Sequence, residues 1–137
     1  MLFSIATARR LGAQVTATDV RPATKEQVQS LGAKFIAVED DEFKQAQTAT
    51  GYAKPMSAEY QAKQAELVAN HIKNQDIVIT TALIPGRPAP KLISKAMIEG
   101  MKPGAVIVDL AAARGGNPQL TEAGKAVETA DGVTIAG

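Results

Sequence analysis

Polar residues stand at or near the ends of three apolar segments, where a sheet of parallel strands would gather a binding site. Asp19, Thr81 and Asp109 occupy these positions, and the small Ala82 follows Thr81 directly. A carboxylate at such a strand end can accept hydrogen bonds from ribose hydroxyls, and small residues there let a ligand approach the backbone. The position of these residues at predicted strand ends is therefore typical of a nucleotide site at the carboxyl edge of a parallel sheet.

Asp19 is the candidate for binding the adenine ribose. A free carboxylate at this position would also repel a 2′-phosphate, which favours NAD over NADP. A second interpretation makes Asp19 a turn residue before Pro22, because aspartate is common in turns. Arg21 can pair with Asp19, lie under an adenine ring or remain solvated.

The other strand ends also allow two interpretations each. Residues 81–83 either let adenosine and its ribose approach the backbone or form a plain junction between strand and loop. Asp109 either contacts a ligand or caps the loop that follows it. The segment 115–117, Gly-Gly-Asn, is interpreted as a turn rather than a ligand contact.

Alternating periodicity predicts the elements that would position these residues. Thr24 as N-cap and Gln27 three residues later predict a capping box, and Gly12 is expected to end the first helix. The polar segment 39–54 is predicted to be a long loop. Helices are expected over residues 5–11, 24–31, 57–73 and 92–101, and strands over residues 14–19, 34–38, 76–81, 105–110 and 133–136. Alternation of this kind predicts an α/β fold, a Rossmann-like doubly wound parallel sheet.

Composition excludes several classes of function. The chain has 137 residues, no cysteine and one histidine, so cysteine-built and histidine-rich metal sites are excluded. A formal net charge of +1 gives no electrostatic reason to expect nucleic acid or an anionic membrane surface as a partner. No apolar run approaches the length of about 18 residues needed for a membrane span. We expect one partial dinucleotide-binding domain over residues 1–137.

The predicted order begins with a helix, whereas a dinucleotide-binding domain begins with a strand and a glycine-rich turn. Both are expected to be missing from this sequence. In a sheet of that topology the absent strand would be central, so the strands that end at Asp19 and Thr81 would each keep an unpaired edge. We therefore expect a homodimer or larger assembly joined through sheet edges, and weak or no NAD binding by the isolated chain.

Several motifs together resemble one family. They are the segments 6–13, 17–21, 24–28, 50–56, 80–90, 108–112 and 115–117. In register they resemble the NAD(H)-binding part of the α subunit of proton-translocating NAD(P) transhydrogenase. Alanine dehydrogenases share the fold and several blocks, but they carry a catalytic aspartate where Ala113 stands and lack the Gly-Tyr-Ala-Lys loop of residues 51–54. The resemblance therefore favours transhydrogenase.

The resemblance implies a function in hydride transfer. Hydride would pass directly between NAD(H) on this chain and NADP(H) on another domain, coupled to proton translocation through a membrane domain. The implied partners are those NADP(H)-binding and membrane domains, and the implied location is the cytoplasmic face of the inner membrane, with the isolated chain soluble. Tyr52 would close over the bound nucleotide, and residues 109–111 would lie near the nicotinamide. The expected NAD-binding residues are Asp19, Val20, Arg21, Tyr52, Thr81, Ala82, Leu83, Asp109, Leu110 and Ala111, with no catalytic residue and no metal ligand.

Two other functions stay open. One is an oxidoreductase resembling alanine dehydrogenase, which would need a pyruvate-binding arginine and lysine from another domain. The other is a non-catalytic Rossmann-like fragment. The sequence departs from the transhydrogenase family in lacking its N-terminal domain, first strand and glycine turn, so we expect the isolated chain to be inactive.

Overall fold

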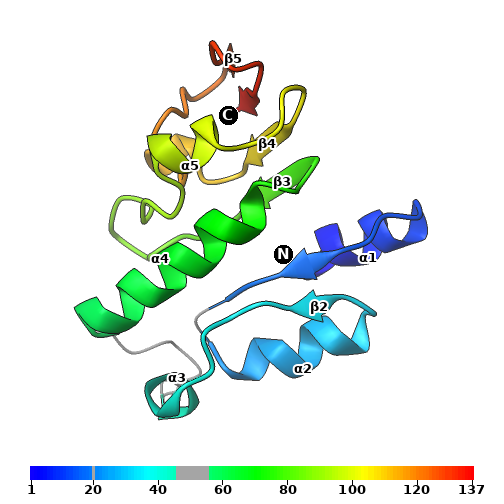
Figure 1. Cartoon of the computed structure of the whole chain (residues 1–137), viewed down its shortest axis with the longest axis vertical. Coiled ribbons are helices and arrows are strands. Elements are labelled where there is room, and N and C mark those ends of the chain that lie inside the picture. Colours follow the sequence, from blue (N-terminus) through cyan, green and yellow to red (C-terminus); the bar gives the residue numbers. More distant parts are fainter. Residues whose placement is uncertain (20, 46–55) are drawn as a thin grey trace. The chain divides into compact units, whose positions relative to one another are not determined.

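The computed structural model describes residues 1–19, 21–45 and 56–137 (Figure 1). The chain divides into two compact units, residues 1–67 and residues 68–137. Both units combine helices with predominantly parallel strands, as the alternating pattern predicts. The expectation that residues 1–137 act as one dinucleotide-binding domain remains a prediction.

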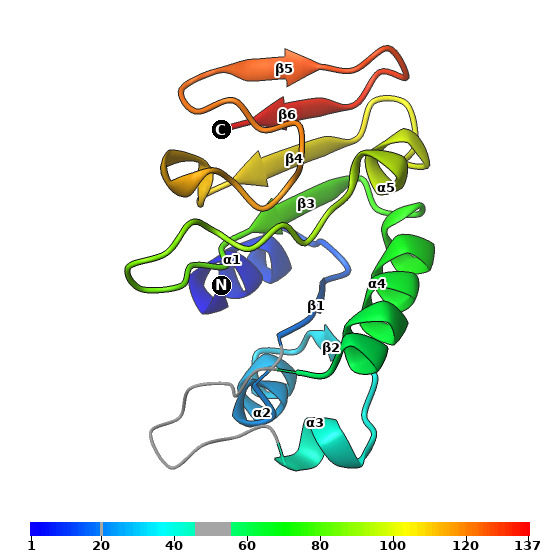
Figure 2. The ribbon, with the colours of Figure 1, turned by 90° about the vertical axis from the view of Figure 1, so that its left-hand side faces the viewer.

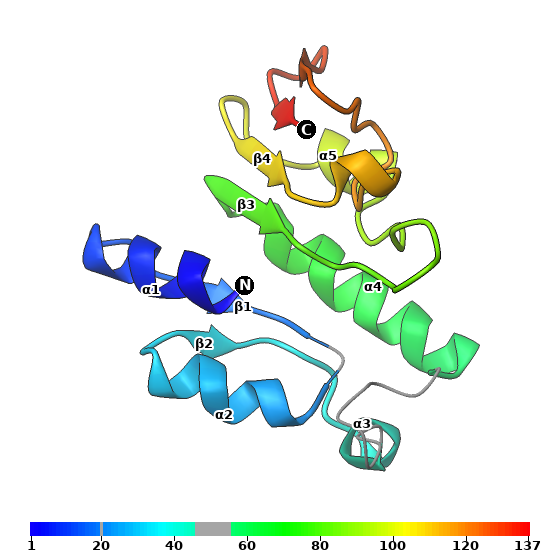
Figure 3. The same ribbon diagram turned by 180° about the vertical axis from the view of Figure 1, so that it is seen from behind.

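The first unit is built around a two-stranded parallel sheet. Its elements are α1 (Leu2–Arg10), β1 (Thr16–Ala17), α2 (Ala23–Ser30), β2 (Lys34–Phe35), α3 (Asp41–Gln45) and the start of α4 (Ala58–Ile72). Thr16 of β1 lies opposite Lys34 of β2, and α2 packs against β2 (Figure 3). The core is small and consists of Ile5, Val28 and Ala33 with partly buried neighbours.

The second unit contains a four-stranded sheet in the order β3-β4-β6-β5 (Figure 2). After the end of α4 its elements are β3 (Ile77–Thr80), α5 (Lys95–Glu99), β4 (Val106–Asp109), the 3₁₀ helix η1 (Ala112–Arg114), β5 (Ala126–Glu128) and β6 (Thr134–Ala136). The strands β3, β4 and β6 are parallel, whereas β5 pairs antiparallel with β6. One face of the sheet buries a core of isoleucines, with Ile98, Ile107 and Ile135 fully buried.

The helix boundaries follow the predictions at some ends and differ at others. As predicted, the turn after α1 is closed by Gly12, whose N–H bonds the Arg9 carbonyl. The prediction of a capping box at Thr24 is wrong, because α2 begins at Ala23 with Pro22 as its N-cap. The proline ring fixes φ near the helical value, so the helix starts earlier than a threonine cap would allow. Thr24 is buried in the first turn and donates its hydroxyl to the Arg21 carbonyl.

The predicted helix over 92–101 is shorter in the structure and begins only after Ser94, whose Oγ accepts from the Met97 N–H at 3.2 Å. The two residues before this cap are held in an extended pairing with another loop. The Leu92 N–H bonds the Asn117 carbonyl at 2.9 Å, and the Ile93 carbonyl accepts from the Gln119 N–H at 3.0 Å. Backbone groups engaged in this way cannot begin a helix.

Two further expectations need correction. The polar segment 39–54 is not wholly a loop, because α3 forms within it and buries Phe43. The ring centroids of Phe43 and Phe35 lie 6.0 Å apart. The strand β5 is absent from the sequence-based expectations, since its short segment carries no alternating apolar pattern. Residues 46–54 of the expected loop lie outside the described residues.

Candidate functional site

Asp19 and Arg21 form a closed pair just beyond β1. Oδ1 of Asp19 accepts from the Arg21 main-chain N–H at 2.9 Å and from Nε at 3.1 Å, while Oδ2 accepts from Nη2 at 2.9 Å. The hydrogen bonds and charge of Asp19 raise the pKa of Arg21 above its ordinary value. The Asp19 side chain keeps 18% of its surface exposed and that of Arg21 46%, so incoming ligand hydroxyls can reach this carboxylate.

Two side chains of α4 bond the segments that follow β1 and β2. Gln64 donates from Nε2 to the Thr18 hydroxyl at 3.0 Å and accepts the Val38 N–H at 3.1 Å. Tyr60 donates its phenol to the Val38 carbonyl at 3.0 Å. Burial, and then the nearby negative charges of α3 and the segment before it, raise the pKa of Tyr60. The phenol therefore stays a neutral donor, and the carboxyl ends of β1 and β2 are held together.

In the second unit, Asp109 is engaged by the protein itself. Its side chain is only 3% exposed and accepts four hydrogen bonds. The donors are the Thr80 hydroxyl at 3.0 Å, the Ala111 N–H at 3.0 Å, the Asn117 N–H at 3.1 Å and the Thr121 hydroxyl at 2.8 Å. This geometry matches the interpretation of Asp109 as a cap of the following loop.

Residues 81–83 directly follow β3, and hydrogen bonds with Asn117 restrain their backbone. Asn117 bonds both main-chain groups of Ala82, accepting its N–H at 3.0 Å and donating to its carbonyl at 2.9 Å. Thr81 and Ala82 are half-buried, whereas Leu83 is 57% exposed. The junction after β3 is thus a restrained segment with one large apolar side chain facing outward.

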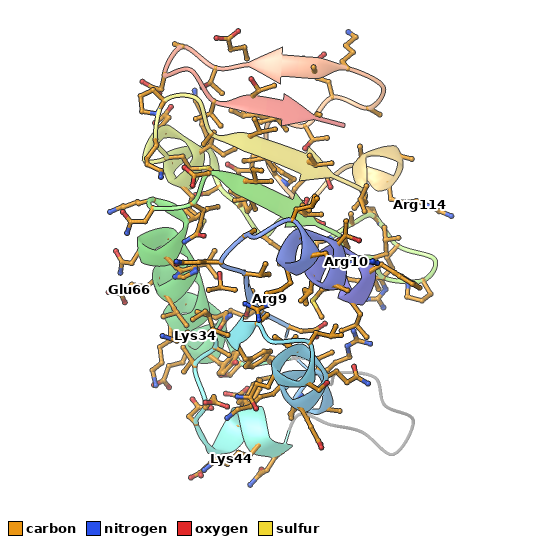
Figure 4. The ribbon with its side chains drawn as sticks, turned by 90° about the vertical axis from the view of Figure 1, so that its right-hand side faces the viewer. Arg9, Arg10, Lys34, Lys44, Glu66 and Arg114 are labelled. Atoms are coloured by element: carbon orange, nitrogen blue, oxygen red, sulfur yellow. The ribbon has the colours of Figure 1, made fainter. Side chains whose placement is uncertain are left out.

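Two apolar side chains stand out at this edge of the second unit. Leu83 follows β3 and Leu110, which is 62% exposed, follows β4. The Leu110 N–H bonds the Thr80 carbonyl at 2.9 Å, which ties the two strand ends together. A pocket of about 250 Å³ opens beside Leu83, lined by the loop 84–86 and Arg114. Figure 4 shows the Arg114 side chain extending outward from η1.

The structure brings the predicted site residues together in two groups. Asp19 and Arg21 form the pair in the first unit. Six others lie at the adjoining ends of β3 and β4 in the second unit, namely Thr81, Ala82, Leu83, Asp109, Leu110 and Ala111. Val20 and Tyr52 lie outside the described residues. The nucleotide-binding role of all ten remains a prediction.

Sequence reasoning misses two supporting residues. Asn117 is interpreted there as part of a turn, and Gln64 is not singled out, yet each amide fixes a backbone segment beside the candidate residues. For Gln64 no local signal exists, because its partners lie 26 and 46 positions away. For Asn117, the preceding glycines and the following proline mark a turn but do not reveal a buried amide.

Two further properties concern the described residues as a whole. Within residues 1–19, 21–45 and 56–137, no cluster of three or more histidine, aspartate or glutamate side chains could hold a metal ion. In the same part of the chain, no helix combines the length and apolar character required to cross a bilayer. What the geometry provides is a reachable carboxylate, a restrained backbone edge and apolar side chains around a shallow pocket.

Comparisons with known proteins connect this arrangement to a family. An NAD(P) transhydrogenase subunit alpha polypeptide of Rhodospirillum rubrum is 60% identical over 136 residues, which is 99% of this chain and 35% of that polypeptide. A transhydrogenase structure from Sinorhizobium meliloti matches with a TM-score of 0.83 and 62% identity, covering 99% of this chain and 34% of that one. An L-alanine dehydrogenase structure matches with a TM-score of 0.67 and 25% identity, covering 96% and 31%.

These likenesses confirm the Rossmann-like α/β fold class and the resemblance to transhydrogenase predicted from the sequence. The chain spans about a third of the length of these three relatives. The profile of the family described as "Alanine dehydrogenase/PNT, C-terminal domain" matches residues 2–137. The chain therefore belongs to the alanine dehydrogenase/PNT C-terminal domain family.

Proposed function

We propose that this chain supplies the NAD(H)-binding part of a proton-translocating NAD(P) transhydrogenase. The observation that carries the proposal is the 60% identity to a transhydrogenase α subunit over 99% of the chain. One feature in each unit supports the proposal. A carboxylate that solvent can reach stands beyond β1 in the first unit, and a restrained backbone edge follows β3 in the second. Asp19 would hold the adenine ribose, and residues 81–83 would contact the adenosine.

When bound, the nicotinamide ring supplies the hydride chemistry. The protein's task is then to bind and orient the dinucleotide, since direct hydride transfer between two nicotinamides needs no general acid or base. Leu110 and Ala111 would lie near the nicotinamide, and Val20, Arg21 and Tyr52 would complete the binding set. NADP(H)-binding and membrane domains of the same enzyme would be the partners, with this part on the cytoplasmic face of the inner membrane.

Titration of the full chain with NADH, followed by amide chemical shifts, tests the proposal and detects weak binding. We expect shifts at Asp19, Arg21 and residues 81–83, with NADH bound more tightly than NADPH because a 2′-phosphate would meet the Asp19 carboxylate. Of the weak or absent NAD binding expected from the sequence, the proposal requires weak binding. NADPH binding as tightly as NADH, or an unchanged spectrum at millimolar NADH, would therefore contradict it.

An oxidoreductase resembling alanine dehydrogenase is the second candidate, favoured by the likeness to an L-alanine dehydrogenase structure over 96% of the chain. The two candidates differ in the hydride acceptor. Oxidation of NADH upon addition of pyruvate and ammonium would support the second candidate. Hydride transfer to NADP⁺ in the presence of the NADP(H)-binding partner would support the first.

A further inference from the structure

Asn117 is a fully buried amide whose hydrogen-bonding groups all have partners. Its side chain accepts from the Ala82 N–H at 3.0 Å and donates from Nδ2 to the Ala82 and Pro90 carbonyls, both at 2.9 Å. The orientation of the amide follows from these partners, because only the oxygen can accept from an N–H and only the nitrogen can donate to two carbonyls. Asn117 therefore pairs with Ala82 as a neighbouring strand would.

The backbone of Asn117 is itself anchored on two sides. Its N–H bonds Oδ2 of Asp109 at 3.1 Å, and its carbonyl accepts from the Leu92 N–H at 2.9 Å. Asp109 ends β4, whereas Ala82 lies two residues beyond the end of β3. The amide consequently links the exits of two neighbouring strands, although it lies 35 positions from Ala82 in the sequence.

Engaging Ala82 in this way has a consequence for its neighbours. Because both main-chain groups of Ala82 bond the protein, the segment has little freedom to rotate, and Leu83 remains the outward-facing side chain. We propose that Asn117 is a positioning residue for the nucleotide, which holds residues 81–83 in the binding conformation before the ligand arrives. The inference rests on the proposed function of the chain.

Preorganisation of this kind acts on affinity. Ordering the backbone of a single residue upon binding would cost enough free energy to weaken affinity about tenfold. Asn117→Ala removes all three side-chain bonds and should release the segment. Gln119→Ala is the matched control, because Oε1 of Gln119 also accepts a main-chain N–H, that of Lys95 at 2.7 Å, but restrains the start of α5 instead.

The test measures the NADH dissociation constant of the full chain and both variants by chemical-shift titration, at a temperature where all three are folded. We expect Asn117→Ala to weaken NADH binding about tenfold and to change the size of the ligand-induced shifts at Thr81 and Leu83 at saturation. Gln119→Ala should stay within about twofold of the unaltered chain. Equal affinity of Asn117→Ala and the unaltered chain, or an equal loss in both variants, would overturn the inference.

Hydrogen exchange on the unaltered chain provides a measurement that needs no variant. The Ala82 amide should exchange far more slowly than the amides of the exposed Ile84 and Gly86, and equal rates would overturn the inference even if Asn117→Ala failed to fold.

Failure of the proposed function and failure of the positioning role give different results. An unaltered chain that does not bind NADH refutes the proposed function and this inference with it. Binding that is insensitive to Asn117→Ala refutes only the positioning role.

Discussion

Arg21 binds the carboxylate of Asp19 through three N–H groups, at distances of 2.9, 3.1 and 2.9 Å. The carboxylate is thereby held at the end of β1 with its oxygens already oriented. Because both side chains retain solvent exposure, their ion pair contributes only about 0–1 kcal/mol to the free energy of folding. Hydrogen bonds from ribose hydroxyls can therefore replace those from Arg21. The pairing of Asp19 with Arg21 is one of the alternatives that the sequence left open, and it is compatible with ligand binding.

The first prediction concerns this carboxylate. Asp19→Asn should weaken NADH binding, since each charge-assisted hydrogen bond to a ribose hydroxyl contributes about 1.5–3 kcal/mol, less what water restores. It should also narrow the preference for NADH over NADPH, because the repulsion of the 2′-phosphate is removed. Calorimetric or chemical-shift titration measures both effects. Asp131→Asn, at an exposed position of the second unit, is the control. An unchanged NADH affinity in Asp19→Asn would show that Asp19 does not bind the ribose.

The second prediction concerns Tyr60 and alkaline pH. The pKa of its phenol is raised in the folded chain, by burial first and then by neighbouring carboxylates, from an ordinary value of 10.0. The folded state therefore holds this proton more tightly than the unfolded state does. The associated stability is fully present below pH 10 and is lost as the pH rises from there through the raised pKa.

Tyr60→Phe isolates that contribution. The variant should be less stable by about 0.5–1.5 kcal/mol near neutral pH, because the Val38 carbonyl loses its donor. Its free energy of unfolding, measured by urea denaturation, should fall less steeply above pH 10 than that of the unaltered chain. Plots of unfolding free energy against pH that run parallel for the two proteins above pH 10 would contradict the prediction. The titration of lysines affects both proteins equally and cancels in the comparison.

The third prediction concerns the buried carboxylate of Asp109. Each of its oxygens accepts one main-chain N–H, from Ala111 or from Asn117. Asp109→Asn must therefore place an amide N–H against a main-chain N–H, whichever way the amide is turned. We expect the free energy of unfolding to fall by about 1–3 kcal/mol. Thr121→Val, which removes a single donor to the same carboxylate, should cost less, and a smaller loss in Asp109→Asn than in Thr121→Val would refute this account.

The sequence predicts the elements that carry regular patterns. The apolar segment around Ile107 has the character of a buried parallel strand, and it forms β4 in the middle of the sheet. Gly12 is expected near the end of α1, and it closes the turn that follows the helix, one residue after the C-cap Leu11. Each of these features depends on residues that are adjacent in the sequence, so local patterns are sufficient to find them.

Features that depend on distant partners escape prediction. The start of α5 is delayed because Leu92 pairs with Asn117, a contact between separate loops. The start of α2 is mispredicted for a local reason instead: the pattern around Thr24 favours a cap, but Pro22 is the N-cap and the helix begins at Ala23. The candidate site shows the same division, since the strand ends can be located while the amide that fixes Ala82 cannot.

The fourth prediction uses two adjacent glycines that differ in their surroundings. Gly115 and Gly116 both have positive φ, at 101° and 82°, so either alanine substitution strains the backbone by about 1–2 kcal/mol. A Cβ on Gly115 would meet nothing within 4 Å, whereas one on Gly116 would lie 2.5 Å from Oδ2 of Asp109 and 2.7 Å from Cβ of Thr121. Gly116→Ala should therefore lower the melting temperature far more than Gly115→Ala, and equal shifts would show that crowding at Asp109 is unimportant.

The last prediction concerns association of the chain with itself. In the described residues β3 pairs with β4 alone, and the side chains of Ile77 and Ile79 on β3 are 67% and 43% exposed. An apolar strand with an unpaired edge is prone to pair with another chain, so we expect a dimer or larger assembly in sedimentation experiments. Ile79→Lys should shift the assembly toward monomer, because a lysine on an edge strand disfavours pairing. Ala130→Lys, on an exposed turn, adds the same charge elsewhere and should not. A monomeric unaltered chain, or equal association of both variants, would show that this edge is not an interface.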